Sequence, residues 1–136
     1  MDKKNLIKKN ERRFTERFHI PDGIAYFRYL KRFNLITNFI GPFPMYDIAS
    51  NSARFECSKE IKIQSEIEIK IKPPAYHDEL RIKGKVIKRA GSRPNQANGY
   101  VIQFNPFGKG FQYNNIQSKT KLQHYIQTMK AKKIAD

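Results

Sequence analysis

Three arginines near the N-terminus, Arg12, Arg13 and Arg17, are the residues of this chain best suited to binding chemistry. Arg13 and Arg17 stand four positions apart in a strongly basic segment. A guanidinium carries a planar fork of N–H donors, so it can bond two phosphate oxygens, or O6 and N7 of guanine, at the same time. The arginines therefore predict a site for an anionic or guanine-bearing ligand.

A second polar segment, Asp47–Ser52, reads Asp-Ile-Ala-Ser-Asn-Ser and stands directly before an expected strand. Asp47 has two possible roles: it contacts a ligand, or it forms a turn by bonding its own backbone. Two roles also remain open for Arg54, which is either a third ligand cation or a solvated strand residue.

These two segments resemble the two binding motifs of PilZ domains, a family of cyclic di-GMP receptors. Arg13 and Arg17 match the family's Arg-x-x-x-Arg motif, and Arg12 is an extra cation beside it. The Asp47–Ser52 segment aligns with the family's Asp/Asn-x-Ser-x-x-Gly motif. In that alignment Ala49 replaces the serine and Ser52 replaces the glycine.

The resemblance implies that the ligand is cyclic di-GMP. The arginines would contact its phosphates and guanine edges, and Asp47 would accept hydrogen bonds from a guanine. The implied ligand-binding set is Arg12, Arg13, Arg17, Asp47, Ala49 and Ser52. Losing the serine hydroxyl removes a hydrogen bond that contributes roughly 0.5–1.5 kcal/mol. A serine in place of glycine costs about 1 kcal/mol if its φ is positive. Together these departures predict affinity weakened by roughly ten- to hundredfold.

Three further landmarks of the family follow in the expected order. Residues 82–89 resemble its Gly-x-Val-x-Arg strand, residues 99–104 its closing strand, and residues 122–126 its terminal helix. The resemblance covers nearly the whole chain. It implies a mainly β fold, namely a six-stranded antiparallel PilZ-type β-barrel with a C-terminal α-helix. The expected division is a basic N-terminal arm at residues 1–12 and a single PilZ-like domain at residues 13–136.

Hydrophobic periodicity predicts strands independently of the family. Isoleucines occupy five of the six odd positions from Ile61 to Ile71 while polar residues fill the even ones, which indicates a strand with one buried face. Further strands are expected at residues 23–30, 80–86 and 99–104. Prolines exclude a helix between Phe33 and Pro44 and leave an edge strand or a loop.

One amphipathic helix is expected at the C-terminal end. Leu122, Tyr125, Ile126 and Met129 recur at the spacing of a helical stripe, and Ser118 is the expected N-cap. The lysines that follow suit the negative end of the helix dipole.

Composition restricts the class of protein. A chain of 136 residues fits one domain, and a formal net charge of +15 predicts attraction to polyanions of any kind. Cys57 is the single cysteine, so no internal disulfide forms, and we expect it to be a core residue.

The three histidines have no metal-ligand spacing. No apolar run is long enough to span a bilayer or to serve as a signal peptide, so a cytoplasmic location is expected.

The expected function is a non-enzymatic receptor or adaptor module that changes its protein-interaction surface when cyclic di-GMP binds. An effector protein, not identified by the sequence, is its expected partner, and no cofactor or metal is expected. No catalytic constellation is evident, which predicts that the chain is not an enzyme. The first alternative is a degenerate PilZ domain that binds no nucleotide and acts as a protein–protein adaptor. The second is a single-stranded nucleic-acid binder that uses the positive charge with Tyr26, Phe27 and Tyr29.

Overall fold

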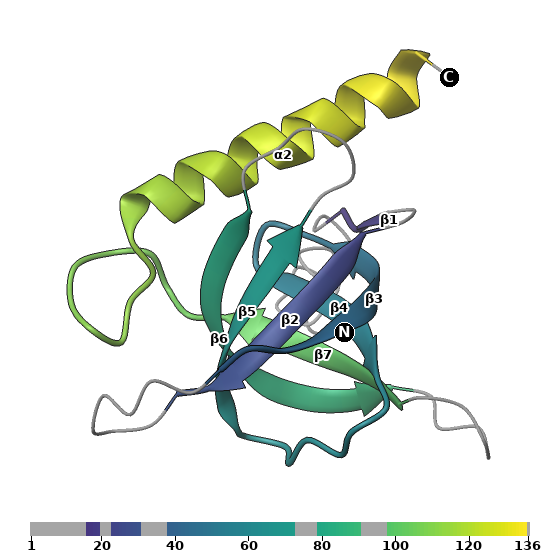
Figure 1. Cartoon of the computed structure of the whole chain (residues 1–136). Helices are drawn as coiled ribbons and strands as arrows, with labels where there is room; N and C mark the ends of the chain where they lie inside the picture. The colour runs from purple at the N-terminus through teal and green to yellow at the C-terminus, as the bar shows by residue number, and fades with distance from the viewer. Residues whose placement is uncertain (1–15, 20–22, 31–37, 73–78, 91–97, 136) are drawn as a thin grey trace, which may run out of the picture.

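Six antiparallel strands, β2 to β7, close into a barrel, and a single helix follows them (Figure 1). A computed structural model describes residues 16–19, 23–30, 38–72, 79–90 and 98–135. The elements are β1 Phe18–His19, β2 Ile24–Tyr29, β3 Ile40–Ile48, β4 Ser52–Cys57, β5 Glu66–Lys72, β6 Leu80–Ala90, β7 Asn98–Phe104 and α2 Ile116–Ala135. The expected mainly β barrel with a C-terminal helix is confirmed.

Strand β3 closes the barrel because it pairs with neighbours on both of its sides. Its first half pairs with β2, and its second half pairs with β4. The short additional strand β1 pairs with the end of β3, on the same residues that face β4. Every one of these ladders is antiparallel. Strand β3 therefore joins β1 to both β2 and β4.

The prolines of β3 lie in the half of the strand that β4 does not pair with. Pro44 is level with Ile24 of β2, whereas pairing with β4 begins at Met45. A proline has no N–H to give to a ladder, so it is tolerated where a strand bonds to one neighbour only. The expectation of an edge strand is confirmed for residues 40–44, while residues 33–37 lie outside the described part of the chain.

The isoleucine alternation forms a strand only in its second half. Ile67, Ile69 and Ile71 are fully buried in β5, as expected. The expectation is wrong before Glu66, because the chain turns there and Gln64 has a φ of 76°. Since this turn breaks the extended backbone, the side chain of Ile63 is 44% exposed instead of facing the core.

Aromatic rings occupy the centre of the barrel. Phe55 lies between Phe27 and Tyr100, with ring centroids 6.0 and 6.3 Å away. Tyr100 accepts a hydrogen bond from the Ile61 backbone N–H at 2.9 Å, so the buried hydroxyl is satisfied and the β4–β5 connection is fixed. Cys57 is fully buried, which confirms its expected place in the core. That burial raises the pKa of its thiol.

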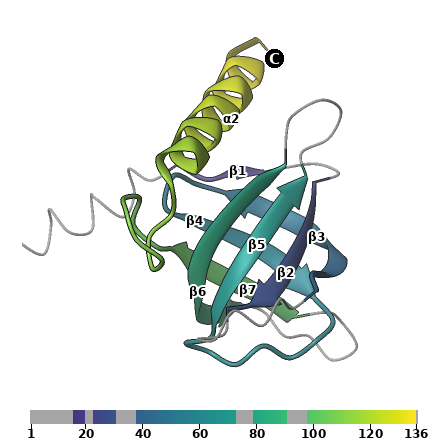
Figure 2. The ribbon, with the colours of Figure 1, turned by 60° about the vertical axis from the view of Figure 1, so that its left-hand side comes forward.

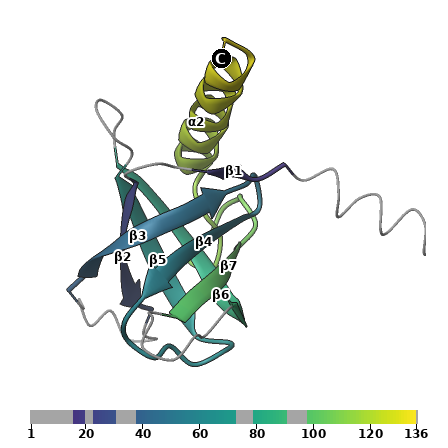
Figure 3. The same ribbon diagram turned by 90° about the vertical axis from the view of Figure 1, so that its right-hand side faces the viewer.

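Helix α2 packs its apolar stripe on the barrel and then extends past it (Figures 2 and 3). Leu122, Tyr125 and Ile126 are buried, which confirms the expected stripe. The expected N-cap is wrong: the Asn115 Oδ1 atom accepts the Ser118 backbone N–H at 2.7 Å, so Asn115 caps the helix. Neither α2 nor any other helix within the described ranges is both long and apolar enough to cross a membrane.

The buried face of β5 provides a test of the strand register. Replacing Ile67 or Ile69 by alanine should lower the free energy of unfolding by roughly 2–5 kcal/mol, because each change leaves a cavity in the core. Ile63→Ala is the matched control, since that side chain is 44% exposed, and it should change stability little. Urea unfolding measures all three variants. Equal losses at the three positions would contradict the register.

The helix–barrel contact predicts a loss of stability in alkali. Burial raises the pKa of Tyr125 to about 12, whereas a tyrosine in the unfolded chain has a pKa of about 10. The unfolded state therefore loses its proton first, and the stabilisation present below about pH 10 is lost as the pH rises towards 12. The Tyr125→Phe variant should lose less stability than the parent between pH 9 and pH 11 in thermal melts. Parallel pH profiles would contradict the assignment.

Candidate functional site

The turn between β3 and β4 is held on both sides by backbone hydrogen bonds. The Ala49 N–H donates to the Ser52 carbonyl at 2.8 Å and closes the turn. The Asn51 carbonyl accepts the N–H of Phe104 at 2.8 Å, which ties the turn to the end of β7. The residues of this segment therefore lie on a rigid support at one end of the barrel.

Strand β1 brings an arginine to this turn. Phe18 pairs with Ile48 and His19 with Asp47, so Arg17 directly precedes a residue paired with the last residue of β3. Figure 3 shows β1 beside the end of β3. The side chain of Arg17 is exposed. The structure thus brings Arg17 to the end of the barrel that carries the Asp47–Ser52 segment. Arg12 and Arg13 lie outside the described residues.

Asp47 is buried and forms an ion pair with Arg54. A β-bulge at Tyr46 sets Asp47 opposite Arg54, whose Nη2 donates to Oδ2 at 2.8 Å. The guanidinium also lies 5.4 Å from the centre of the Tyr46 ring. Asp47 is therefore a strand residue with a cationic partner and not a self-bonded turn aspartate. Arg54 in turn is not a fully solvated strand residue. To contact a ligand it would have to do so while bonded to Asp47, or give up that ion pair.

Arg54 also retains unused hydrogen-bonding capacity. Its Nε atom is buried and has no hydrogen-bond partner among the residues that the structure describes. A buried guanidinium donor without a partner is unfavourable, so this nitrogen lowers the stability gained from the ion pair. Sequence reasoning did not identify the pair, because the bulge at Tyr46 shifts the register by which the two residues meet.

The two positions that depart from the family motif differ in their surroundings. Ala49 is fully buried, so a serine hydroxyl there would need a partner inside the protein or on the ligand. Ser52 is half-buried at the start of β4. Gln64 is the one non-glycine residue with positive φ in the described ranges, so Ser52 carries no such strain. The conformational cost expected for serine at this position therefore does not arise.

A second cluster of functional groups lies on the outer face of β2, β5 and β6, which form one wall of the barrel (Figure 2). The half-buried ring of Phe39 has three cations around it. The distances to its centroid are 4.4 Å from Lys70, 4.5 Å from Arg28 and 5.3 Å from Arg81. Tyr26 has Lys70 at 4.7 Å and Lys72 at 5.4 Å. We call this wall the basic–aromatic face.

Sequence reasoning missed this face, although its signal was present. The polar positions of the β5 alternation include Lys70 and Lys72, and β2 places Tyr26 on the same side. The aromatic set expected for a nucleic-acid surface is wrong in part, because Phe27 is buried in the core and Tyr29 packs against it. Phe39 could not be assigned to this face from the sequence, since no strand or helix periodicity relates it to the other residues of the face.

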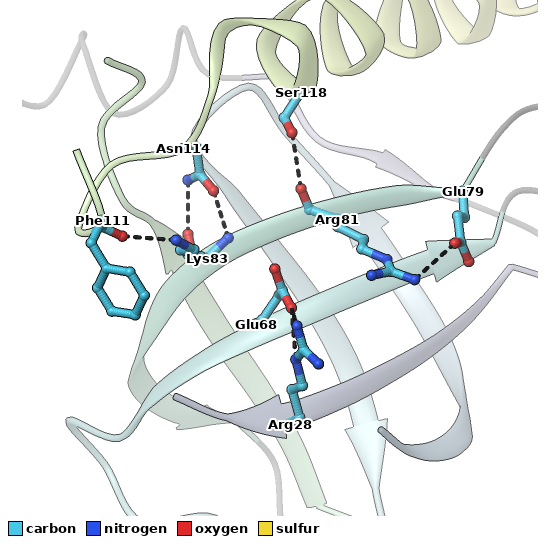
Figure 4. A network of polar contacts seen from close by, with 8 residues as sticks. All are labelled: Arg28, Glu68, Glu79, Arg81, Lys83, Phe111, Asn114 and Ser118. Carbon is cyan, nitrogen blue, oxygen red and sulfur yellow. Dashed lines mark hydrogen bonds and ion pairs between the residues drawn. The ribbon is translucent and has the colours of Figure 1, made fainter. Parts of the chain in front are cut away.

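A polar network supports the basic–aromatic face (Figure 4). Arg28 Nε donates to Glu68 at 2.7 Å, which fixes the guanidinium across the strands. The buried amide of Asn114 accepts the Lys83 N–H at 2.6 Å and donates to the Lys83 carbonyl at 2.9 Å. Lys83 Nζ donates to the Phe111 carbonyl at 2.7 Å and lies 4.4 Å from its ring centroid. The loop before α2 is thereby fixed with Phe111, 66% exposed, at its surface.

No protein-family model matches this chain, and no curated protein is similar enough to be a relative. Among the described residues, no group of histidine, cysteine, aspartate and glutamate could hold a metal ion. The geometry of the β3–β4 turn and the motif resemblance are therefore the grounds for a functional assignment.

The Asp47–Arg54 pair provides a test of the site's construction. Arg54→Ala should destabilise the fold by about 1–3 kcal/mol, because it leaves a buried carboxylate without its cation. The expected loss is smaller than for a fully buried pair, since the Arg54 side chain is 37% exposed. Adding Asp47→Ala should recover part of the loss, and urea unfolding of both single variants and the double variant measures the coupling. Additive losses would show that the two side chains do not interact.

Proposed function

We propose that this protein is a cyclic di-GMP-binding signalling module that changes its protein-interaction surface when the ligand binds. The observation that supports it most is the pairing of β1 with β3. That pairing brings Arg17, from the first candidate motif, next to the Phe18–Ile48 pair, directly before the turn that carries the second motif. Arg17, the described arginine of the first candidate motif, is thus near the segment that resembles the other half of a PilZ site.

In this proposal the arginines supply charge and Asp47 supplies the acceptor. Arg12, Arg13 and Arg17 contact the phosphates and guanine edges, because forked guanidiniums suit both. Asp47 accepts hydrogen bonds from the other guanine, and Ala49 and Ser52 form the adjoining part of the turn. No bond is made or broken and no cofactor or metal takes part, so the protein acts as a receptor and not as an enzyme.

Ligand binding would act as a switch by ordering the arginine-bearing segment against the barrel. An effector protein that recognises the ordered surface then shifts the equilibrium further, since it binds one state better than the other. The ligand is an intracellular messenger, so the proposal includes a cytoplasmic location.

The ion pair of Asp47 favours a second candidate, a non-binding adaptor with the same fold. The carboxylate already has a cation at 2.8 Å, and Ala49 is fully buried. A guanine must compete with Arg54 for Asp47, or use the free capacity of both side chains. If the competition is lost, the turn serves only as structure and the protein binds its partner without nucleotide.

Calorimetric titration of the full chain with cyclic di-GMP separates the two candidates. The receptor proposal expects binding that Arg13→Ala and Arg17→Ala each weaken by about 2–3 kcal/mol, because each removes charged hydrogen bonds. Lys62→Ala, an exposed cation in the turn before β5, is the matched control and should leave affinity unchanged. Cyclic di-AMP and GTP test the choice of ligand. Unchanged affinity in the double arginine variant would rule out this site, and a parent protein that releases no heat with cyclic di-GMP would favour the adaptor.

A further inference from the structure

The basic–aromatic face carries more positive charge than its own carboxylates can neutralise. Up to the bulge in β6, its three strands place six cations on the outer surface: Arg28, Lys70, Lys72, Arg81, Lys83 and Lys85. Glu66 and Glu68 are the carboxylates on the same surface, and Glu79 precedes β6. Among the described residues, Glu68 pairs with Arg28 and Glu79 with Arg81, while no carboxylate pairs with Lys70 or Lys72.

One cross-strand pair on this face joins two cations, whereas Glu68 stands opposite Lys83 and Glu66 opposite Lys85. Lys70 stands directly opposite Arg81 in the β5–β6 register. Like charges that face each other across two strands destabilise a sheet. The ring of Phe39 lies close to both groups and relieves part of the repulsion through its π face. A bound anion between them would relieve the rest, which indicates a surface built to receive negative charge.

Aromatic rings alternate with these cations. Tyr26 lies beside Lys70 and Lys72, and Phe39 lies beside Lys70 and Arg81. Phe111 lies in the loop before α2, is 66% exposed, and borders the face through Lys83, which lies next to its ring. Bases stack on exposed rings and on guanidinium planes, while neighbouring cations bind the phosphates.

The shape of the face suits an extended chain better than a small ligand. Neighbouring strands lie about 4.8 Å apart and alternate residues along a strand about 7 Å apart, so these cations are spread over an open area of the barrel wall. A small ligand needs a concave pocket that covers most of its surface. The hollow beside Arg81, lined by Ser118 and Lys121 of α2, continues the face towards the helix.

We propose that the basic–aromatic face binds single-stranded nucleic acid, with Lys70, Lys72 and Arg81 at the phosphates and Phe111 stacked on a base. An acidic protein segment would form ion pairs with the cations but would make no stacking contact with the exposed ring of Phe111. The formal net charge of +15 for the whole chain favours the same polyanion. None of these residues belongs to the β3–β4 turn, so the proposal does not depend on cyclic di-GMP binding.

The test is fluorescence anisotropy of the full chain with a labelled single-stranded oligouridine, repeated with oligothymidine, over a series of salt concentrations. The Lys70→Ala/Lys72→Ala variant should bind more weakly at low salt. Its slope of log affinity against log salt should be shallower by about 1.4, since each lost phosphate contact removes about 0.7 for a single strand. The matched control is Lys59→Ala/Lys62→Ala, which removes two exposed lysines from the connection between β4 and β5. It should keep the slope of the parent.

Phe111→Ala tests stacking separately from charge. This variant should weaken binding by about fivefold to a hundredfold with the salt slope unchanged, because a base–ring contact involves no phosphate. Phe111 is exposed, so the change should not affect folding, and a thermal melt checks this.

Three results would overturn the proposal. The first is an equal loss in the face variant and in the lysine control, which would mean attraction to net charge alone. The second is full affinity in Phe111→Ala. The third is preferential binding of oligoglutamate, or of vesicles containing phosphatidylglycerol, with oligonucleotides failing to compete. That result would assign the face to an acidic protein or to a membrane.

Discussion

The closure of the barrel through β3 is the constraint on which the rest of the structure depends. Strand β3 pairs with β2 along its first half and with β4 along its second half. Its last two residues also pair with β1. This arrangement brings the segment that follows the N-terminal arginines to the far end of the same strand. Without it, Arg17 and the Asp47–Ser52 segment would be unrelated in space, and neither would constitute a site.

The same closure divides the chemistry of the barrel between two surfaces. The β3–β4 turn is held by backbone hydrogen bonds, and Asp47 at the end of β3 beside it is a buried carboxylate that already has a partner. The wall of β2, β5 and β6 is open and carries cations held against aromatic rings. A compact dinucleotide and an extended polyanion make opposite demands on a protein surface, so the two proposals of ligand concern different surfaces of this small barrel.

Much of the fold was predictable from local patterns. Alternation correctly identified the buried face of β5, and the strands expected at residues 80–86 and 99–104 are present as β6 and β7. Helical spacing identified the buried stripe of α2, because such patterns depend on residues close in sequence. The errors occurred where a single residue changes the local geometry. Gln64 with its positive φ ends the isoleucine pattern early, and Asn115, not Ser118, provides the cap.

The site was less predictable than the fold, because its contacts depend on register between distant segments. The motif resemblance identified Asp47, but the bulge at Tyr46 decides that Arg54 is its partner. The basic–aromatic face depends likewise on three strands and on Phe39, which follows no period of its own. Neither arrangement can be read from a single stretch of sequence.

The side chain of Asn114 has a consequence for how copies of this protein behave towards one another. Strand β7 pairs with β6 only as far as Gly84, so the preceding residues of β6 form a short edge. The Asn114 amide bonds both backbone groups of Lys83 as a neighbouring strand would, and Ser118 bonds the carbonyl of Arg81. An uncovered edge is a template on which strands of other molecules can add and aggregate. These two side chains take the place of a further strand at Arg81 and Lys83 and protect the barrel from growth at that edge.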